Sequence, residues 1–246
     1  MILKLKILFA LSFLGLSVFS QEKALEIPHF GKHDTITEHT AYFVSYNSKY
    51  RQANWVAYQL TKLECEKSVE RSNKFLADPK LQNSNNAADY KKSGYDRGHL
   101  APAAEMSFSE ITMKESFYFS NMSPQTPSFN RGIWKKLEEQ TRDWAIEYDS
   151  LYIAVGPVLN DSLCKIGPHQ LAVPQFYYKV ILDLDKNHPK AIAFLMENEN
   201  SKSPLKTFVV SIDVLEKMTE IDFFPLVDDK IEQELEEKVC LSCWGL

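Results

Sequence analysis

The sequence predicts an α+β fold, in which mixed antiparallel sheets are flanked by helices. Two observations support this prediction. Between Phe176 and Leu184 apolar side chains recur at every second residue, which is the period of a β-strand. Over residues 130–148 they recur at helical spacing, on one face. Strand-like segments lie on both sides of this helix, so blocks of strands and helices alternate along the chain.

Each expected element has its own local pattern. Aromatic and β-branched residues predict strands over residues 40–46, 55–60, 151–159, 175–185 and 191–197. Helices are expected over residues 130–148, 211–224 and 226–238. The segment Ser107-x-x-Glu110 resembles a capping box and predicts a further short helix. Residues 72–95 are polar without periodicity, so we expect a long surface loop there.

Residues 1–20 have the features of a secretory signal peptide. Lys4 and Lys6 precede an apolar run of 13 residues, which is short for a membrane span of about 20 residues. An uncleaved anchor is the alternative. Because no Gly/Ser/Pro-rich linker divides the remainder, residues 21–246 are predicted to form one domain, secreted or periplasmic and not bound to a membrane after cleavage.

The chain has four cysteines, all in the part that would be exported: Cys65, Cys164, Cys240 and Cys243. An even number outside the cytosol favours disulfide bonds, and we expect no free thiols. The Cys240-x-x-Cys243 pair could also be a redox pair or half of a zinc site. A zinc site would need two more ligands, and the sequence has no second CxxC.

The formal net charge of −5 is distributed unevenly. Residues 213–238 contain ten acidic residues and three lysines, so the rest of the exported chain is neutral. Residues 70–97 have a basic tendency. A uniformly acidic surface would repel a polyanion, whereas a segregated charge distribution is compatible with a nucleic-acid partner.

An acid, a guanidinium and an imidazole occur within four positions, in Asp96-Arg97-Gly98-His99. Such groups are costly to bury unless each is paired, so this density suggests a working site. Gly98 allows the backbone to bend and present His99 beside Arg97. A turn with a surface ion pair is the alternative interpretation.

Asn130 and Glu138 lie on the same predicted helix. An amide oxygen and a carboxylate suit a hard cation such as Mg²⁺, which keeps most of its waters. Eight residues span about 12 Å along a straight helix axis, so both cannot bind one ion directly. Asn130 would be the direct ligand and Glu138 would act through water. Alternatively, Asn130 is only a helix N-cap and Glu138 only a solvated helix residue.

Three ordered motifs give the sequence a family resemblance. Asp-Arg-Gly-His-Leu-Ala-Pro at 96–102, Ser-Asn-Met-Ser-Pro-Gln at 120–125 and Asn-Arg-Gly-x-Trp-x-x-Leu-Glu at 130–138 resemble the DNA/RNA non-specific endonuclease family. The resemblance covers roughly residues 41–225. It implies that residues 21–246 are a single nuclease domain, in which a ββα-metal finger holds the active site.

The resemblance also implies how the metal and the water are handled. His99 matches the general base, Asn130 the sole direct protein ligand of the metal, and Glu138 a carboxylate that orients water on the metal. The implied cofactor is Mg²⁺, for which Mn²⁺ would be a possible substitute.

The remaining matches concern the phosphate and the frame of the site. Arg71 and Arg97 match phosphate-binding arginines, and the position of Arg71 depends on a loop of variable length. Asn121 and Gln125 match polar residues that brace the site, and Asp96 matches the structural acid of the motif.

Together these residues predict a secreted, metal-dependent endonuclease that hydrolyses phosphodiester bonds. A neutral His99 would take a proton from water, and no step uses a 2′-hydroxyl or a base edge, so both DNA and RNA are expected substrates. Homodimers occur in the family and are possible here. The alternatives are a non-catalytic nucleic-acid-binding surface protein, a metal-dependent phosphodiesterase of small nucleotides and, more distantly, a cysteine-based redox protein.

Overall fold

The structure of the protein is a computed structural model that describes residues 24–29, 31, 36–66, 69–82 and 84–246. The expected signal peptide lies outside these residues. Among the residues described, no helix is long and apolar enough to cross a membrane.

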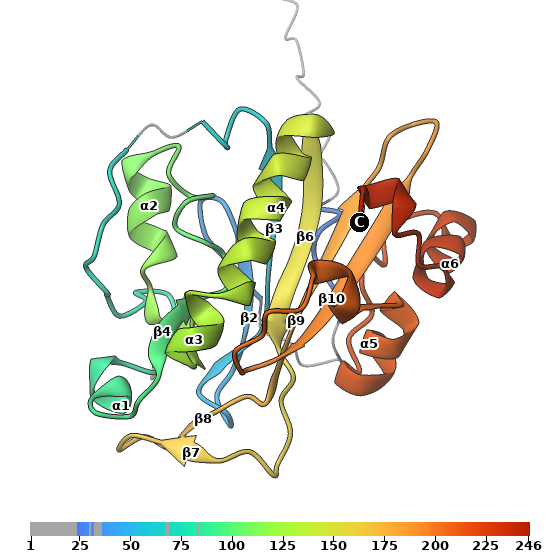
Figure 1. The fold of residues 1–246 in the computed structure, drawn as a ribbon. Coiled ribbons are helices and arrows are strands. Elements are labelled where there is room, and N and C mark those ends of the chain that lie inside the picture. Colours follow the sequence, from blue (N-terminus) through green and yellow to red (C-terminus); the bar gives the residue numbers. More distant parts are fainter. Residues whose placement is uncertain (1–23, 30, 32–35, 67–68, 83) are drawn as a thin grey trace, which may run out of the picture.

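A seven-stranded antiparallel sheet forms the centre of the molecule (Figure 1). Its strand order is β1-β2-β3-β6-β9-β10-β11. The strands are β1 Ile36–Glu38, β2 Phe43–Asn47, β3 Gln52–Thr61, β6 Ser150–Pro157, β9 Phe176–Asp183, β10 Lys190–Glu197 and β11 Val209–Val210. The predicted α+β class, with an antiparallel sheet and flanking helices, is confirmed.

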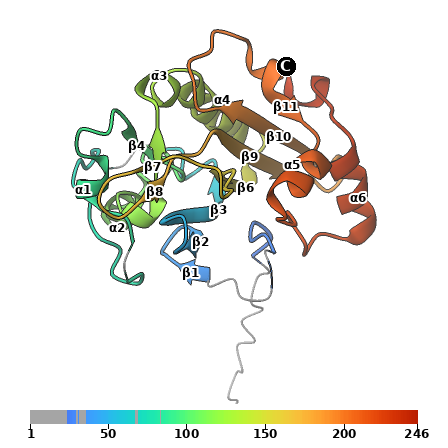
Figure 2. The same cartoon turned by 90° about the horizontal axis from the view of Figure 1, so that it is seen from below.

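Helices cover both faces of this sheet (Figures 1 and 2). The α-helices are α1 Ala87–Tyr90, α2 Glu110–Ser116, α3 Pro127–Asn130, α4 Ile133–Glu147, α5 Ile212–Thr219 and α6 Asp229–Glu237. The 3-10 turns are η1 Phe119–Asn121, η2 Leu205–Phe208 and η3 Ser242–Trp244. The loop predicted over residues 72–95 is therefore interrupted by the single turn of α1.

The alternation along β9 divides the core into two halves. Tyr177 and Ile181 pack with α4 on one face of the sheet. Tyr178 and Val180 pack with α5 on the other face. Because both faces are covered, nearly every residue of β9 is buried, although only one set of alternate positions is uniformly apolar.

A second, small sheet lies on the α4 side. Its strands β4 (Asp96–His99) and β5 (Met122–Gln125) are antiparallel and place His99 opposite Met122. Since α3 and α4 follow β5 directly, the order is strand, strand and helix, as expected for a ββα finger. Two further short strands, β7 (Lys165–Ile166) and β8 (Leu171–Ala172), form a separate pair.

The helix predicted over residues 130–148 is α4, which starts three residues later than predicted. Asn130 ends the short helix α3, and α4 begins at Ile133 with Gly132 as its N-cap. The interpretation of Asn130 as the N-cap of the long helix is therefore wrong. Gly132 has φ −108° and ψ −112°, a conformation that interrupts the helical path.

Two other helix boundaries also differ from the predictions. The side chain of Ser109, not Ser107, caps α2 by accepting a hydrogen bond from the amide of Thr112. Helix α5 ends at Thr219, because the next residue, Glu220, has a left-handed φ of 59°, so the helix predicted to continue to Phe224 stops earlier.

The cysteine prediction is only partly correct. Cys240 and Cys243 form a disulfide bond, whereas Cys65 and Cys164 are free thiols. Cys65 is half-buried after β3, and Cys164 is exposed before β7. The expectation that no thiol is free is therefore wrong. An even cysteine count does not place two such distant segments in contact.

Candidate active site

His99 ends β4 with its imidazole enclosed by aromatic rings. The ring of Phe117 packs edge-on at 4.7 Å and that of Phe75 lies at 6.0 Å, both between centroids. Only 8% of His99 is exposed. Its Nε2 atom is buried and has no hydrogen-bond partner among the described residues. An unpaired buried nitrogen is costly, which is typical of a group that meets a ligand or water during function.

The glycine before His99 is required by close packing between β4 and β5. A Cβ atom at Gly98 would lie 2.1 Å from Oε1 of Gln125, whose side chain crosses this position. Gln125 is fully buried, and neither polar atom of its side chain has a hydrogen-bond partner in the described part of the chain. Gln125 therefore lies directly beside the backbone that presents His99.

Burial keeps His99 neutral. It lowers the pKa of the imidazole from 6.5 to about 3, and the positive charges of Arg71 and Arg97 act in the same direction. At neutral pH the imidazole is therefore unprotonated, and one ring nitrogen keeps a lone pair.

Both predicted arginines lie against the rings that enclose His99. The guanidinium carbon of Arg97 lies 3.8 Å from the ring centroid of Phe75. That of Arg71 lies 5.3 Å from the ring centroid of Phe117. Both side chains are exposed, so their charges are accessible to an anion. Such stacking suits arginine, whose weakly hydrated plane keeps its donors free at the edge.

Asp96 connects β4 to the end of α3. Its carboxylate accepts a hydrogen bond of 2.9 Å from Nδ2 of Asn130 and two, of 2.8 and 2.7 Å, from Nε and Nη2 of Arg131. Burial would raise the pKa of Asp96, but the hydrogen bonds from Arg131 and Asn130 outweigh it and hold the pKa below its usual value. Because Nδ2 is engaged, the orientation of the Asn130 amide is fixed, and its Oδ1 is the atom left for a cation.

Glu138 lies half-buried on α4. Burial raises the pKa of its carboxyl to about 7, against the opposing charges of Lys179, Arg142 and Arg71. The charge of Arg71 thus influences the pKa of both His99 and Glu138.

Comparison with known proteins settles the family. The DNA/RNA non-specific endonuclease family matches residues 22–230. The chain belongs to this family. Nuclease C1 of Cunninghamella echinulata var. echinulata is 33% identical over 227 residues, which are 85% of this chain and 90% of the relative. Human mitochondrial endonuclease G is 32% identical over 201 residues, covering 75% and 68% of the two chains.

A solved structure agrees with these relatives. A chain in the crystal structure of the EndoG/EndoGI complex superposes with a TM-score of 0.76 at 31% identity, over 82% of this chain and 90% of that chain. The protein is thus a non-specific endonuclease, from a family that depends on a metal.

In this endonuclease Asn121 secures the chain just after His99. Its Oδ1 accepts a hydrogen bond of 2.9 Å from the amide of Ala101. Its Nδ2 donates to the carbonyl groups of Ala101 and Ser116, at 2.9 and 2.8 Å. Every polar atom of this buried side chain is therefore used within the fold, as a bracing role requires.

Only some of the predicted residues open onto one cleft. Asp96, Arg97 and Asn130 line a cleft of about 510 Å³ between α1 and β4, together with Phe75. His99 is not among the lining residues, although Phe75 packs against it. Arg71 lines a different pocket of about 310 Å³, with Arg142.

Two residues of this endonuclease were not predicted from the sequence. Arg131 donates two hydrogen bonds to the carboxylate of Asp96. Arg131 belongs to the Asn-Arg-Gly motif, but the motif does not indicate that Asp96 is its partner. Lys179 is fully buried on β9, and its Nζ has no hydrogen-bond partner among the described residues. A lysine within an otherwise buried strand was the available signal, because buried lysines are rare unless their charge is used.

Proposed function

We propose that this endonuclease is exported and cleaves DNA and RNA with one Mg²⁺, using His99 as the general base. The observation that supports this most directly is the neutral, enclosed imidazole, whose Nε2 has no partner among the described residues and which lies near two exposed arginines. A base that must deprotonate water needs this protonation state.

The protein side chains divide the reaction among them. His99 takes a proton from the attacking water. Arg71 and Arg97 bind the non-bridging phosphate oxygens through charge-assisted hydrogen bonds. Arg97 can bind phosphate through its edge donors while its guanidinium stacks on the ring of Phe75. Catalytic contacts often form only when substrate is bound.

The residues present fit a hard cation. Asn130 offers an amide oxygen whose orientation Asp96 fixes, and Glu138 offers a carboxylate whose elevated pKa indicates that a positive charge would stabilise its ionised form. Asn130 would hold the ion directly and Glu138 through water. A bound Mg²⁺ would supply charge stabilisation at the phosphate and at the departing oxygen.

Three substitutions test this scheme. His99→Ala should lose about 10²–10⁴-fold in nicking rate, the usual effect of removing a general base, yet still bind Mg²⁺. Asn130→Ala should lose both activity and Mg²⁺ affinity, whereas Glu138→Gln should be milder and partly rescued by added metal. Plasmid-nicking rates and isothermal titration of Mg²⁺ measure both quantities.

His188→Ala provides the matched control, because this histidine is exposed in the turn between β9 and β10. It should nick DNA at the normal rate. Near-normal turnover in His99→Ala, or unchanged Mg²⁺ affinity in Asn130→Ala, would refute the proposed roles.

The substrate range can be tested on the wild-type protein. Since no proposed step uses a 2′-hydroxyl or a base edge, DNA and RNA of the same sequence should be cut at comparable rates. Cleavage of small nucleotide diesters alone would favour a phosphodiesterase, and nucleic-acid binding without EDTA-sensitive cleavage would favour a binding protein.

Export is proposed from the sequence of residues 1–20. Mass spectrometry of the mature protein should give an N-terminus near Gln21, one disulfide bond and two alkylatable thiols, those of Cys65 and Cys164. A chain that retains residues 1–20 in the medium or periplasm would contradict cleavage.

A further inference from the structure

The cleft that contains Asn130 and Arg97 extends well beyond these two residues. Its volume of about 510 Å³ falls within the range of about 300–1,000 Å³ that usually holds a small-molecule ligand. Its far wall is formed by Ala87, Ala88 and Lys91 at α1, which lies beside β4 in both views (Figures 1 and 2). The space is therefore larger than one phosphate group needs.

Aromatic and cationic side chains line this extension. Tyr95 is half-buried and directly precedes Asp96. Lys91 is exposed and forms no ion pair with any residue that the structure describes. Aromatic rings that stack on bases, with cations along the backbone path, are typical of sites for single-stranded nucleic acid.

Two further features of the cleft favour an anionic, polar occupant. Tyr90 is only 8% exposed, and its hydroxyl has no hydrogen-bond partner in the described part of the chain. The carboxylate of the lining residue Asp96 is already neutralised by Arg131. The charges left for a ligand are therefore those of Arg97 and Lys91, both positive.

We propose that this cleft is a subsite for the nucleotide next to the scissile phosphate. Its base stacks on Tyr95 and its distal phosphate binds Lys91. The proposal rests on the proposed function, because Arg97 would hold the scissile phosphate at the near end of the cleft, beside the cation that Asn130 would bind. A base held there has left the double-helical stack, so a single strand enters at lower cost than a duplex.

The test measures kcat/KM on single-stranded oligonucleotides of two to six residues, and their binding in EDTA by fluorescence anisotropy. For the wild-type protein, kcat/KM should rise about tenfold at the length that first fills the cleft. Tyr95→Ala should remove this step and weaken binding about tenfold, in the range for base stacking, whereas Tyr95→Phe should keep most of both. Tyr95→Ala should lower the rate of cleavage of duplex plasmid less than that of single-stranded oligonucleotides.

Lys91→Ala should lower the slope of log affinity against log salt by about one, as expected for the loss of one phosphate contact. The matched control is Lys186→Ala, an exposed lysine in the β9–β10 turn at the other end of the molecule. If Tyr95→Ala and Lys91→Ala behave like this control at every length, the subsite is refuted. If the wild-type protein cuts nothing, the proposed function fails, and unchanged anisotropy in both variants then refutes the subsite separately.

Discussion

At the scale of single residues, burial changes the two titratable groups of the site in opposite directions. It lowers the pKa of His99 to about 3 and raises that of Glu138 to about 7. In each case burial favours the neutral form of the side chain, because a low-dielectric environment disfavours charge. A neutral imidazole is the active form of a base, whereas a neutral carboxyl is the inactive form of a group that must face a cation.

The acid limb of the pH–rate profile should therefore belong to Glu138. Below pH 7 the carboxyl gains a proton, whereas His99 stays neutral down to about pH 3. At low Mg²⁺, kcat/KM should fall as pH drops through about 7. Raising Mg²⁺ should shift this limb to lower pH, because the cation and the proton compete for one carboxylate. Rates on plasmid DNA from pH 4 to 9, at two Mg²⁺ concentrations, measure both effects.

Lys179 gives a control for this assignment. Its buried charge favours the ionised form of Glu138, so Lys179→Met should shift the limb to higher pH, and Lys179→Arg should shift it less. Glu138→Gln should remove the limb. If the limb is unchanged in Glu138→Gln, another group, such as His99, controls it.

At the scale of elements, the site depends on the break between α3 and α4. A Cβ atom at Gly132 would lie 2.3 Å from the backbone carbonyl oxygen of Ser128, so the last turn of α3 and the start of α4 can approach only with glycine there. This approach places Asn130 at the end of α3, where it meets Asp96 from β4. Asn130, the proposed metal ligand, is therefore positioned by β4 and the end of α3 together.

Gly132→Ala should displace α3, because the obstructing atom belongs to the backbone and cannot rotate away. We expect a loss of about 1–3 kcal/mol in the free energy of unfolding, the usual range for overpacking, and a weaker affinity for Mg²⁺. Denaturant unfolding and isothermal titration measure the two effects. Lys136→Ala, at an exposed position of α4, should change neither. Unaltered Mg²⁺ affinity in Gly132→Ala would show that Asn130 does not depend on this break.

The sequence predicted elements better than their junctions. The strands β3 and β9 follow from local alternation and aromatic content, which a single segment contains. The position of the Asn130 side chain does not, because it is fixed by a hydrogen bond to Asp96, which lies 34 residues earlier. Helical periodicity continues across Arg131 and Gly132 as if nothing intervened. The role of Lys179 was hidden for the same reason, since its charge matters only beside Glu138 of another element.

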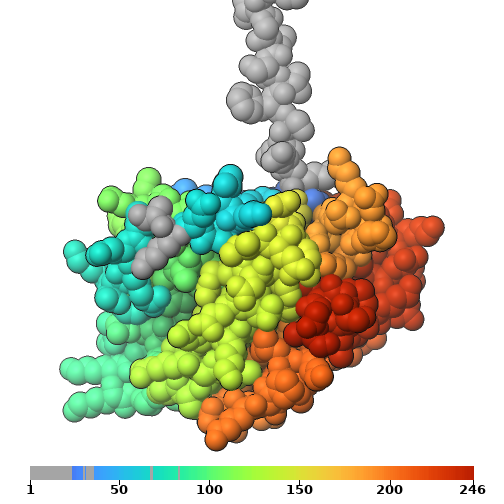
Figure 3. Space-filling model, turned by 45° about the horizontal axis from the view of Figure 1, so that its top comes forward, coloured from blue at the N-terminus to red at the C-terminus, as the bar shows by residue number. Residues whose placement is uncertain are grey.

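At the scale of the whole molecule, the central sheet separates the candidate active site from the acidic C-terminal helices. The candidate site lies on the face covered by α4, whereas α5 and α6 lie on the other face (Figures 1 and 2). The C-terminal turn η3 returns to the first face, where Trp244 packs on Trp144 of α4, so the two segments are neighbours on the surface (Figure 3). The acidic excess of residues 213–238 is thus held away from Arg71 and Arg97, which leaves the approach to these two arginines free of that repulsion.

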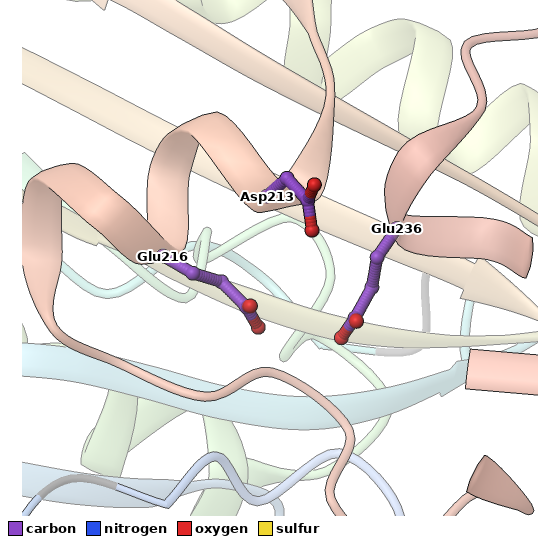
Figure 4. A group of neighbouring side chains, drawn as sticks. All are labelled: Asp213, Glu216 and Glu236. Atoms are coloured by element: carbon purple, nitrogen blue, oxygen red, sulfur yellow. The ribbon is translucent and has the colours of Figure 1, made fainter. Parts of the chain in front are cut away.

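Carboxyl groups of α5 and α6 cluster on the acidic face. Asp213 and Glu216 of α5 point toward Glu236 of α6 (Figure 4), and ligand oxygens of these three residues lie within 4.8 Å of one another. Burial, and then neighbouring carboxylates, raise the pKa of Glu232 to about 7 and that of Glu236 to about 8. The folded state therefore binds protons here that the unfolded chain, with pKa values near 4.5, does not.

The free energy of unfolding should consequently fall as pH rises from about 5 to 8, as these carboxyls lose their protons. The whole loss should be present above pH 8. This is the sign for carboxyls whose pKa is raised by folding, and it is opposite to that for ion-paired ones. Thermal unfolding across this range measures this loss of stability.

Glu236→Gln should flatten the pH dependence of stability and raise the melting temperature at pH 8, whereas Glu237→Gln, at an exposed position of α6, should do neither. Nicking rates should be nearly normal in both variants, since the cluster lies on the other face of the sheet. A melting temperature that rises with pH, or a Glu236→Gln variant less stable at pH 8, would mean that an unseen cation or base neutralises the cluster.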